Sequence, residues 1–220
     1  MKKIIAIIIA AAAVYAAGED AAITYIHGAA TVTRSGTTTT AVSGSALREN
    51  DRITTADGAT VIIALIDGTR VKVNERSTVT LAAVTGGKKN ILLTLGSIFA
   101  KVKKLGVAEE FTVSTPTVTA AVRGTQFFIG YGTDKGIDTD QWLCVNEGAV
   151  AVHAAATKDT APVTVKQGEG IFIVNGKKIT KPKPYAWTKK LNWNMDAAQG
   201  TVEDGGALKS AYDILKKHYD

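Results

Sequence analysis

Turn dipeptides that recur between short β-branched runs constrain the fold of this chain more than any other feature. From residue 23 to residue 180, no segment has helical apolar spacing over ten residues. The turn signals between the runs are Asp67-Gly68, Gly96-Ser97, Glu147-Gly148 and Asn175-Gly176. Asp-Gly and Asn-Gly favour type I′ hairpin turns, whose central residues both need positive φ, whereas Gly-Ser suits type II′ and Glu-Gly is weaker. Local hairpins imply antiparallel pairing, so the sequence predicts an all-β fold: antiparallel strands and hairpins in a sandwich or layered β-meander.

Alternation of polar and apolar residues supports strands with one buried face. In the segment 70–73, Arg-Val-Lys-Val, the valines are expected to face the core and the cations to face water. Lys101 and Lys103 alternate with apolar residues in the same way, and the tract Thr37–Thr40 suits an edge strand. With 45% hydrophobic and 21% charged residues among 220, the chain can bury a hydrophobic core.

The N-terminus has the parts of a secretory signal peptide. Lys2 and Lys3 precede a short apolar run, and Val14-Tyr15-Ala16 places small residues at the cleavage positions. A membrane anchor is the alternative, but the run is shorter than the ~20 residues that a spanning helix needs. We expect a signal peptide at residues 1–17 and export to the periplasm or the cell surface. Without its two lysines the formal net charge falls from +6 to +4, which gives no reason to expect nucleic acid as a partner.

The chain changes character after the predicted β domain, residues 18–180. Lys181-Pro-Lys-Pro184 is a stiff connector, and the rest of 181–220 forms a C-terminal appendage. Its apolar residues have helical spacing, which predicts one or two short C-terminal helices that pack back on the sheet. The residues with this spacing are Trp187, Leu191 and Met195 in the first helix, and Leu208, Ala211, Tyr212 and Leu215 in the second.

Basic and aromatic residues interleave in this appendage and form a candidate partner-binding surface. Its members are Lys181, Lys183, Trp187, Lys189, Lys190 and Trp193. Such a pattern can bind anionic polymers, including cell-envelope glycans. The favoured interpretation is a solvated connector whose tryptophans pack against the sheet.

Catalytic and metal-binding patterns are missing from the sequence, so we expect neither an enzyme nor a cofactor. His27, His153 and His218 have no metal-ligand spacing, and no Gly-x-Ser-x-Gly occurs. The loop 132–140 carries three aspartates that could hold calcium, but an ordinary acidic loop is favoured. Cys144 lies in an apolar strand pattern and is expected to be a buried hydrophobe.

The stretch TAAVRGTQFFIG, residues 119–130, contains a change of strand register. Apolar residues occupy even positions up to Val122 and odd positions from Phe127 onward. A regular strand cannot change faces without a slip of one residue, so we predict a bulge near Gly124, with Val122 and Phe127 both in the core. Arg123 would then bridge neighbouring strands through a carboxylate, either Glu147 or Asp67. A ligand-reading Arg-Gly-Thr loop is the less favoured alternative.

Four stretches in this order resemble the FecR domain. They are Gly28–Arg34 followed by Asn50–Thr55; the hairpin around Asp67 and Gly68; Phe111–Pro116 followed by Ala121–Phe127 with Arg123, Gly124 and Thr125; and Val145–Gly148 with Glu147 and Gly148. The resemblance implies an exported all-β module. The best-known members pass an outer-membrane iron-uptake signal to a sigma factor through a cytoplasmic segment and a transmembrane helix. Only three residues precede the apolar run here, so we expect the exported domain without the cytoplasmic anti-sigma segment.

The sequence therefore predicts a non-catalytic exported module of the cell envelope that binds a partner protein or an envelope glycan. One alternative is an extracellular structural subunit that self-assembles through its strand edges. A second alternative is a periplasmic signalling component of FecR type. Nucleic acid and small-molecule substrates are not expected as partners.

Overall fold

Two β-sheets and a C-terminal segment make up the described part of the chain. The computed structural model describes residues 20–132, 140–155 and 161–204. The predicted signal peptide and the predicted helix around Leu208 lie outside these residues. The strands are β1 (Ala21–His27), β2 (Ala30–Arg34), β3 (Thr37–Thr40), β4 (Ala46–Leu47), β5 (Arg52–Thr55), β6 (Thr60–Leu65), β7 (Arg70–Val73), β8 (Thr78–Ala83), β9 (Lys88–Lys101), β10 (Glu110–Ser114), β11 (Val118–Val122), β12 (Gln126–Tyr131), β13 (Gln141–Glu147), β14 (Ala149–Ala154), β15 (Val163–Lys166), β16 (Glu169–Val174), β17 (Lys178–Ile179) and β18 (Lys183–Pro184).

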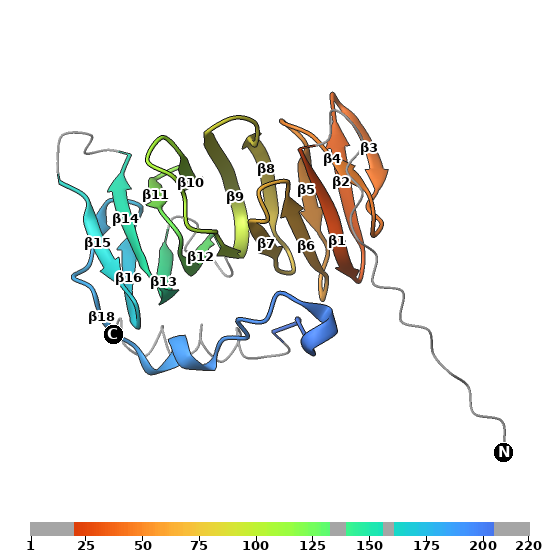
Figure 1. The fold of residues 1–220 in the computed structure, drawn as a ribbon. Coiled ribbons are helices and arrows are strands. Elements are labelled where there is room, and N and C mark those ends of the chain that lie inside the picture. The colour runs from red at the N-terminus through yellow and green to blue at the C-terminus, as the bar shows by residue number, and fades with distance from the viewer. Residues whose placement is uncertain (1–19, 133–139, 156–160, 205–220) are drawn as a thin grey trace, which may run out of the picture.

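The sheets share one long strand, β9, and lie against each other as two layers (Figure 1). Sheet A has the order β4-β1-β6-β7-β9-β12-β13-β16, and both β17 and β18 pair with β16. Sheet B has the order β3-β2-β5-β8-β9-β10-β11-β14-β15. The all-β prediction is confirmed. The pairing of β9 with β10 is parallel, which the hairpin signals did not predict.

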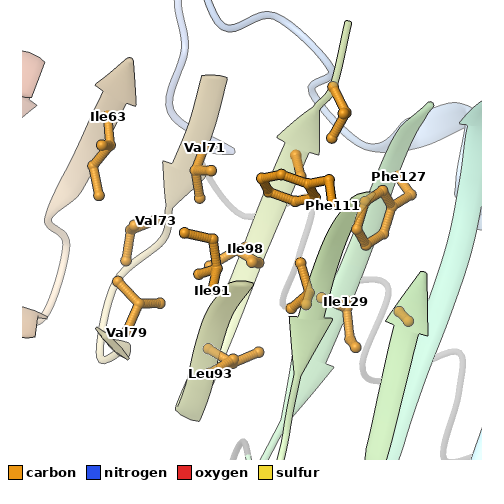
Figure 2. Close-up of a cluster of buried hydrophobic side chains, with 14 of the residues drawn as sticks. Ile63, Val71, Val73, Val79, Ile91, Leu93, Ile98, Phe111, Phe127 and Ile129 are labelled. Carbon is orange, nitrogen blue, oxygen red and sulfur yellow. The ribbon is translucent and has the colours of Figure 1, made fainter. Parts of the chain in front are cut away.

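The main core lies between the inner faces of the two sheets (Figure 2). Val71 and Val73 of β7 point into it, as the alternation predicted. Valines and isoleucines from sheet B meet them, with Phe111 and Phe127 as the largest members of the cluster. This is the interdigitated inner layer that a two-sheet sandwich requires.

The Gly96-Ser97 turn prediction is wrong, because β9 runs without a break from Lys88 to Lys101. Its first part pairs with β8 and β10 in sheet B, and its last part with β7 and β12 in sheet A. Gly96 has φ +86°, and a Cβ there would lie 2.5 Å from the Cα of Ser77. Glycine is therefore used for a close backbone approach where β9 passes from one sheet to the other.

The other turn signals have different outcomes. Asn175 and Gly176 both have positive φ between β16 and β17, which confirms the type I′ prediction. At Asp67-Gly68 the β6–β7 hairpin forms, but only Gly68 has positive φ. Glu147-Gly148 joins β13 in sheet A to β14 in sheet B, so it is a connection between layers and not a hairpin.

The C-terminal segment crosses the outer face of sheet A. We call residues 185–204 the strap; in Figure 1 it is the blue segment that runs back from β18 past the strands. Its regular parts are two 3₁₀ helices, η1 (Ala186–Lys190) and η2 (Ala197–Gln199). The predicted helix through Met195 is therefore wrong beyond η1, since Leu191 is already extended. An extended chain advances about 3.3 Å per residue against 1.5 Å in a helix, so it covers more of the sheet.

A second apolar cluster joins the strap to sheet A. Trp187, Leu191 and Met195 are all buried, so their predicted shared apolar face exists without the helix. The sheet contributes residues of β6, β9, β12, β13 and β16, namely Ile62, Phe99, Phe128, Trp142, Cys144 and Phe172. Within the described ranges, the longest helix is far too short to cross a membrane.

Candidate functional site

The register change at Gly124 is the point where the chain passes from sheet B to sheet A. β11 ends at Val122 in sheet B, and β12 begins at Gln126 in sheet A. Val122 and Phe127 both lie in the main core and residues 123–125 interrupt the strands, so their inward positions are confirmed, whereas the predicted bulge is wrong. The slip of face comes from a change of sheet and not from a bulge within one strand.

Gly124, Thr125 and Gly148 meet at this crossing. The Thr125 hydroxyl donates to the Ala149 carbonyl at 2.9 Å. Gly148 has φ +81°, and a Cβ there would lie 2.7 Å from the Gly124 carbonyl oxygen. The two glycines therefore let the two connections between the layers pack closely.

The predicted clamp at Arg123 is wrong. Its side chain is exposed, and within the described ranges no carboxylate lies at ion-pair distance from it. Glu147 is exposed as well, and Asp67 pairs instead with Lys89 at 3.1 Å. Because the Arg123 side chain is exposed to water, its charge needs no buried partner. Asp67 also accepts from the Thr69 amide at 2.8 Å, which shapes the β6–β7 turn at Gly68.

The tryptophans of the candidate partner-binding surface pack on sheet A. Trp187 is 2% exposed, and Trp193 meets Phe99 edge to face at 5.1 Å. The indole N–H of Trp193 donates to the Thr188 carbonyl at 2.9 Å. The four lysines of this surface stand in a different environment, since all are exposed: Lys181, Lys183, Lys189 and Lys190. Trp187 is therefore core, Trp193 is half-buried against the sheet, and the four lysines face outward.

A buried ion pair between Lys72 and Asp204 joins the end of the strap to sheet A. The Lys72 ammonium lies 3.2 Å from the Asp204 carboxylate and 4.0 Å from the centre of the Phe99 ring. It also donates to the carbonyls of Asn192 and Val202. The alternation predicted that Lys72 faces water, and this prediction is wrong because the strap covers the outer face. Burial lowers the pKa of Lys72 and raises that of Asp204, and each partner opposes the other's shift.

A second polar contact holds the strap beside this pair. The Tyr25 hydroxyl of β1 donates a short hydrogen bond to the Glu203 carboxylate. This bond lowers the pKa of Glu203 and raises the pKa of Tyr25 to about 12. The sequence offered no signal for either contact, since the partners are more than a hundred residues apart.

A cleft lies between the strap and the outer face of sheet A. Arg70, Lys101 and Gln126 are cross-strand neighbours on β7, β9 and β12, and they form its floor. The strap supplies the wall with Trp193 and the stretch 194–201, and the cleft has a volume of about 520 Å³. Gln126 is tied to the wall through the Trp193 carbonyl at 2.9 Å.

Two asparagines fix the shape of this wall. The Asn192 side-chain amide donates to the carbonyls of Thr201 and Glu203 at 2.8 and 3.0 Å. The Asn194 amide donates to the carbonyls of Gly200 and Thr201, both at 3.1 Å. These bonds tie the two ends of an irregular loop together, so the wall keeps its form without regular secondary structure.

The remaining chemistry-bearing residues do not gather. Cys144 is buried under the strap, as predicted, and burial raises the pKa of its thiol. His27 and His153 are exposed on different strands, while His218 lies outside the described residues. Across residues 20–132, 140–155 and 161–204, no three His, Cys, Asp or Glu side chains cluster as metal ligands. Most of the proposed calcium loop falls outside those ranges.

Comparisons with known proteins give one family and one fold. Residues 51–151 match the family described as FecR protein, from just before β5 to within β14. Two crystal structures of "a putative anti-sigma factor" from Parabacteroides distasonis ATCC 8503 have a similar fold, with a TM-score of 0.52 and 20% identity. The alignments cover 63% of this chain, and 63% and 62% of those chains. The chain thus spans less than two thirds of the length of these structures, and the likeness shows the fold alone. No curated protein matches the chain.

Proposed function

Because residues 51–151 of this chain match the FecR family, we propose that the protein is a non-catalytic signalling component of the cell envelope that works by binding a protein partner. The family match is the observation that carries the proposal. The sequence patterns left open whether the partner is a protein or a glycan, and the family match favours a protein. The anti-sigma description of the structurally similar protein is consistent with a regulatory role.

The geometry supports a binding role for one part of the domain. The cleft floor, with Arg70, Lys101 and Gln126, belongs to the matched domain, whereas its wall comes from the strap beyond it. A concave polar surface built by a rigid scaffold is the usual setting for recognition. The proposed location is the periplasm or the cell surface, in keeping with the predicted signal peptide.

Crosslinking in the native envelope tests this function. The full chain, tagged at its C-terminus, is crosslinked in cells, recovered under denaturing conditions and identified with its partners by mass spectrometry. We expect one envelope protein in constant ratio to the bait, and we expect that protein to bind the purified chain. Recovery of glycan alone, or of no protein that binds in the purified system, would contradict the proposal.

Self-assembly through strand edges is the competing function, and β3 is the edge that could support it. All four threonines of β3 are exposed, and only β2 pairs with it among the described strands. Multi-angle light scattering on the purified chain separates the two functions. A signalling component that binds a partner is expected to be monomeric, and a concentration-dependent series of larger species would favour self-assembly.

A further inference from the structure

Five cations gather where β9 ends, and four of them have no acidic partner among the described residues. Lys101, Lys103, Lys104 and Arg123 are exposed, and none of the described carboxylates lies at ion-pair distance from them. Arg70 is the fifth, and its Nη1 lies 3.6 Å from the Asp196 carboxylate. Arg70 is therefore the one cation of the five with an ion pair among the described residues, and the other four favour an anionic partner.

Two of these cations, Arg70 and Lys101, line the cleft, and the other three lie where the chain leaves β9. Arg70 and Lys101 are direct neighbours across β7 and β9, so their backbones lie about 4.8 Å apart. Lys103 follows two residues after Lys101 on the same side of the chain, about 7 Å further along. Val102 and Thr125 exchange backbone hydrogen bonds of 2.9 and 3.2 Å, which brings Lys104 beside the Gly124 connection that carries Arg123.

The interior of the cleft suits a peptide more than a flat surface. Its lining is mainly polar, with the Gln126 amide below and backbone of the strap at the side. The wall beside the floor makes the site concave, which suits a peptide chain more than the flat surface of a bilayer. The Trp193 ring packs edge to face against Phe99, and its N–H donates to the Thr188 carbonyl. These contacts give Trp193 a structural role, so its presence in the wall is no specific sign of a glycan site.

We propose that an acidic segment of the protein partner binds in this cleft, with Arg70 and Lys101 on its floor, and continues over Lys103, Lys104 and Arg123 beyond the end of β9. The inference rests on the proposed function and adds the chemistry of the partner. Carboxylates of the segment pair with the cations, and its main chain meets the polar lining. Arg123, which forms no structural clamp, is assigned a contact with the partner.

Binding of a labelled acidic peptide tests the site directly. The probe is fluorescein-labelled hexaglutamate, and its anisotropy is followed as the purified full chain is added. The test variant is K101Q/K103Q/R123Q, and the matched control is K166Q/K177Q/K178Q, which removes the same charge from exposed lysines that do not line the cleft. Exposed ion pairs contribute roughly 0.5 kcal/mol each, so we expect about tenfold weaker binding for the test variant. The control should stay within about twofold, and both variants should unfold at the urea midpoint of the parent chain.

Several results would overturn the proposal. An equal loss of peptide affinity in the two variants would mean that binding depends on the net charge of the protein and not on a particular site. Binding to phosphatidylglycerol vesicles without binding to hexaglutamate would assign the surface to a membrane, and preference for oligogalacturonate would assign it to a glycan. Crosslinking with K101Q/K103Q/R123Q separates this inference from the proposed function. If this variant captured the partner as well as the parent chain does, the proposed site would be wrong and the proposed function would still hold. If the parent chain bound the peptide but captured no partner, the proposed function would be wrong and the acidic-peptide site would still hold.

Discussion

The outer faces of the two sheets differ in chemistry and in what covers them. Sheet A carries Ile62, Phe99, Phe128 and Phe172 outward, and the strap buries them. Sheet B turns hydroxyl-bearing side chains outward, and within the described ranges no segment covers them. These residues are Thr31, Thr33, Thr54, Thr78, Thr80, Ser114 and Thr119, all partly or fully exposed.

The difference shows that the composition of a strand indicates whether one or both of its faces are buried. In β8 the run 78–81, Thr-Val-Thr-Leu, alternates strictly, which is the pattern of a strand with one wet face. In β12, Phe127-Phe-Ile129 is apolar on both faces, and β13 and β16 contain similar runs. Such strands need cover on both sides, and the strap supplies the second cover in sheet A.

The largest effect should come from uncovering sheet A. Replacement of Trp187 by alanine removes the largest fully buried side chain and leaves a cavity, so we expect a loss of about 3–5 kcal/mol in the free energy of unfolding. Thr80→Ala on the outer face of sheet B is the matched control, and a surface change of this kind should stay within about 0.5 kcal/mol. Urea titrations followed by circular dichroism measure both, and similar losses would break the contrast between the faces.

Next in size is the buried pair. Lys72→Met alone leaves the Asp204 carboxylate buried without its cation, and we expect a loss of about 3 kcal/mol. The double variant K72M/D204N removes both charges, so it should recover most of that loss in the same urea titration. A double variant as unstable as the single one would mean that the ion pair itself, and not the unpaired charge, governs the stability of the strap.

The crossing at Gly124 decides which face of β12 turns inward, and its replacement should have an intermediate effect. Gly124→Ala puts a Cβ 2.9 Å from the Lys104 Cα at φ +90°, so we expect a loss of about 2 kcal/mol or more. Gly58→Ala is the control, because Gly58 has φ +65° and open space around it, and only the backbone cost of about 1 kcal/mol applies. Differential scanning calorimetry of both variants measures the difference. Equal losses would show that close approach at the crossing is unimportant.

The smallest effect is a dependence on pH at the contact between Tyr25 and Glu203. The Glu203 pKa is lowered from 4.5, so the stability it contributes is present above pH 4.5 and is lost as the pH falls through its folded pKa. The Tyr25 pKa is raised from 10.0 to about 12, so its contribution is present below pH 10 and is lost between pH 10 and about 12. Tyr25→Phe should cost about 1 kcal/mol at neutral pH and less at either extreme.

Urea midpoints from tryptophan fluorescence, measured on the parent chain and Tyr25→Phe at matched pH, test this dependence. Asp204 has a raised pKa and an opposite trend with pH, but it is present in both chains and cancels in the difference. A constant difference from acid to alkaline pH would show that the hydroxyl contributes nothing through Glu203.

Sequence reasoning was accurate where neighbouring residues decide the structure. It found the Asn175-Gly176 turn, because the φ values of two residues set that turn, and the inward positions of Val122 and Phe127, because side chains alternate along a strand. It failed at Gly96 and at Glu147-Gly148, where a change of sheet and a hairpin have similar local signals. It also assigned Arg123 a structural partner that the described residues do not provide.

The sequence by itself determined the all-β class, the inner face of most strands and the burial of Trp187, Leu191 and Met195. These follow from turn chemistry and from the periodicity of apolar residues, which are local properties. Tertiary structure decided that β9 serves both sheets, that Lys72 is buried, and that Arg70 and Lys101 form the floor of a cleft. The double role of β9 depends on its pairing with strands of both sheets. The burial of Lys72 and the cleft depend on the strap lying over sheet A, and contacts between residues more than a hundred positions apart leave no local pattern.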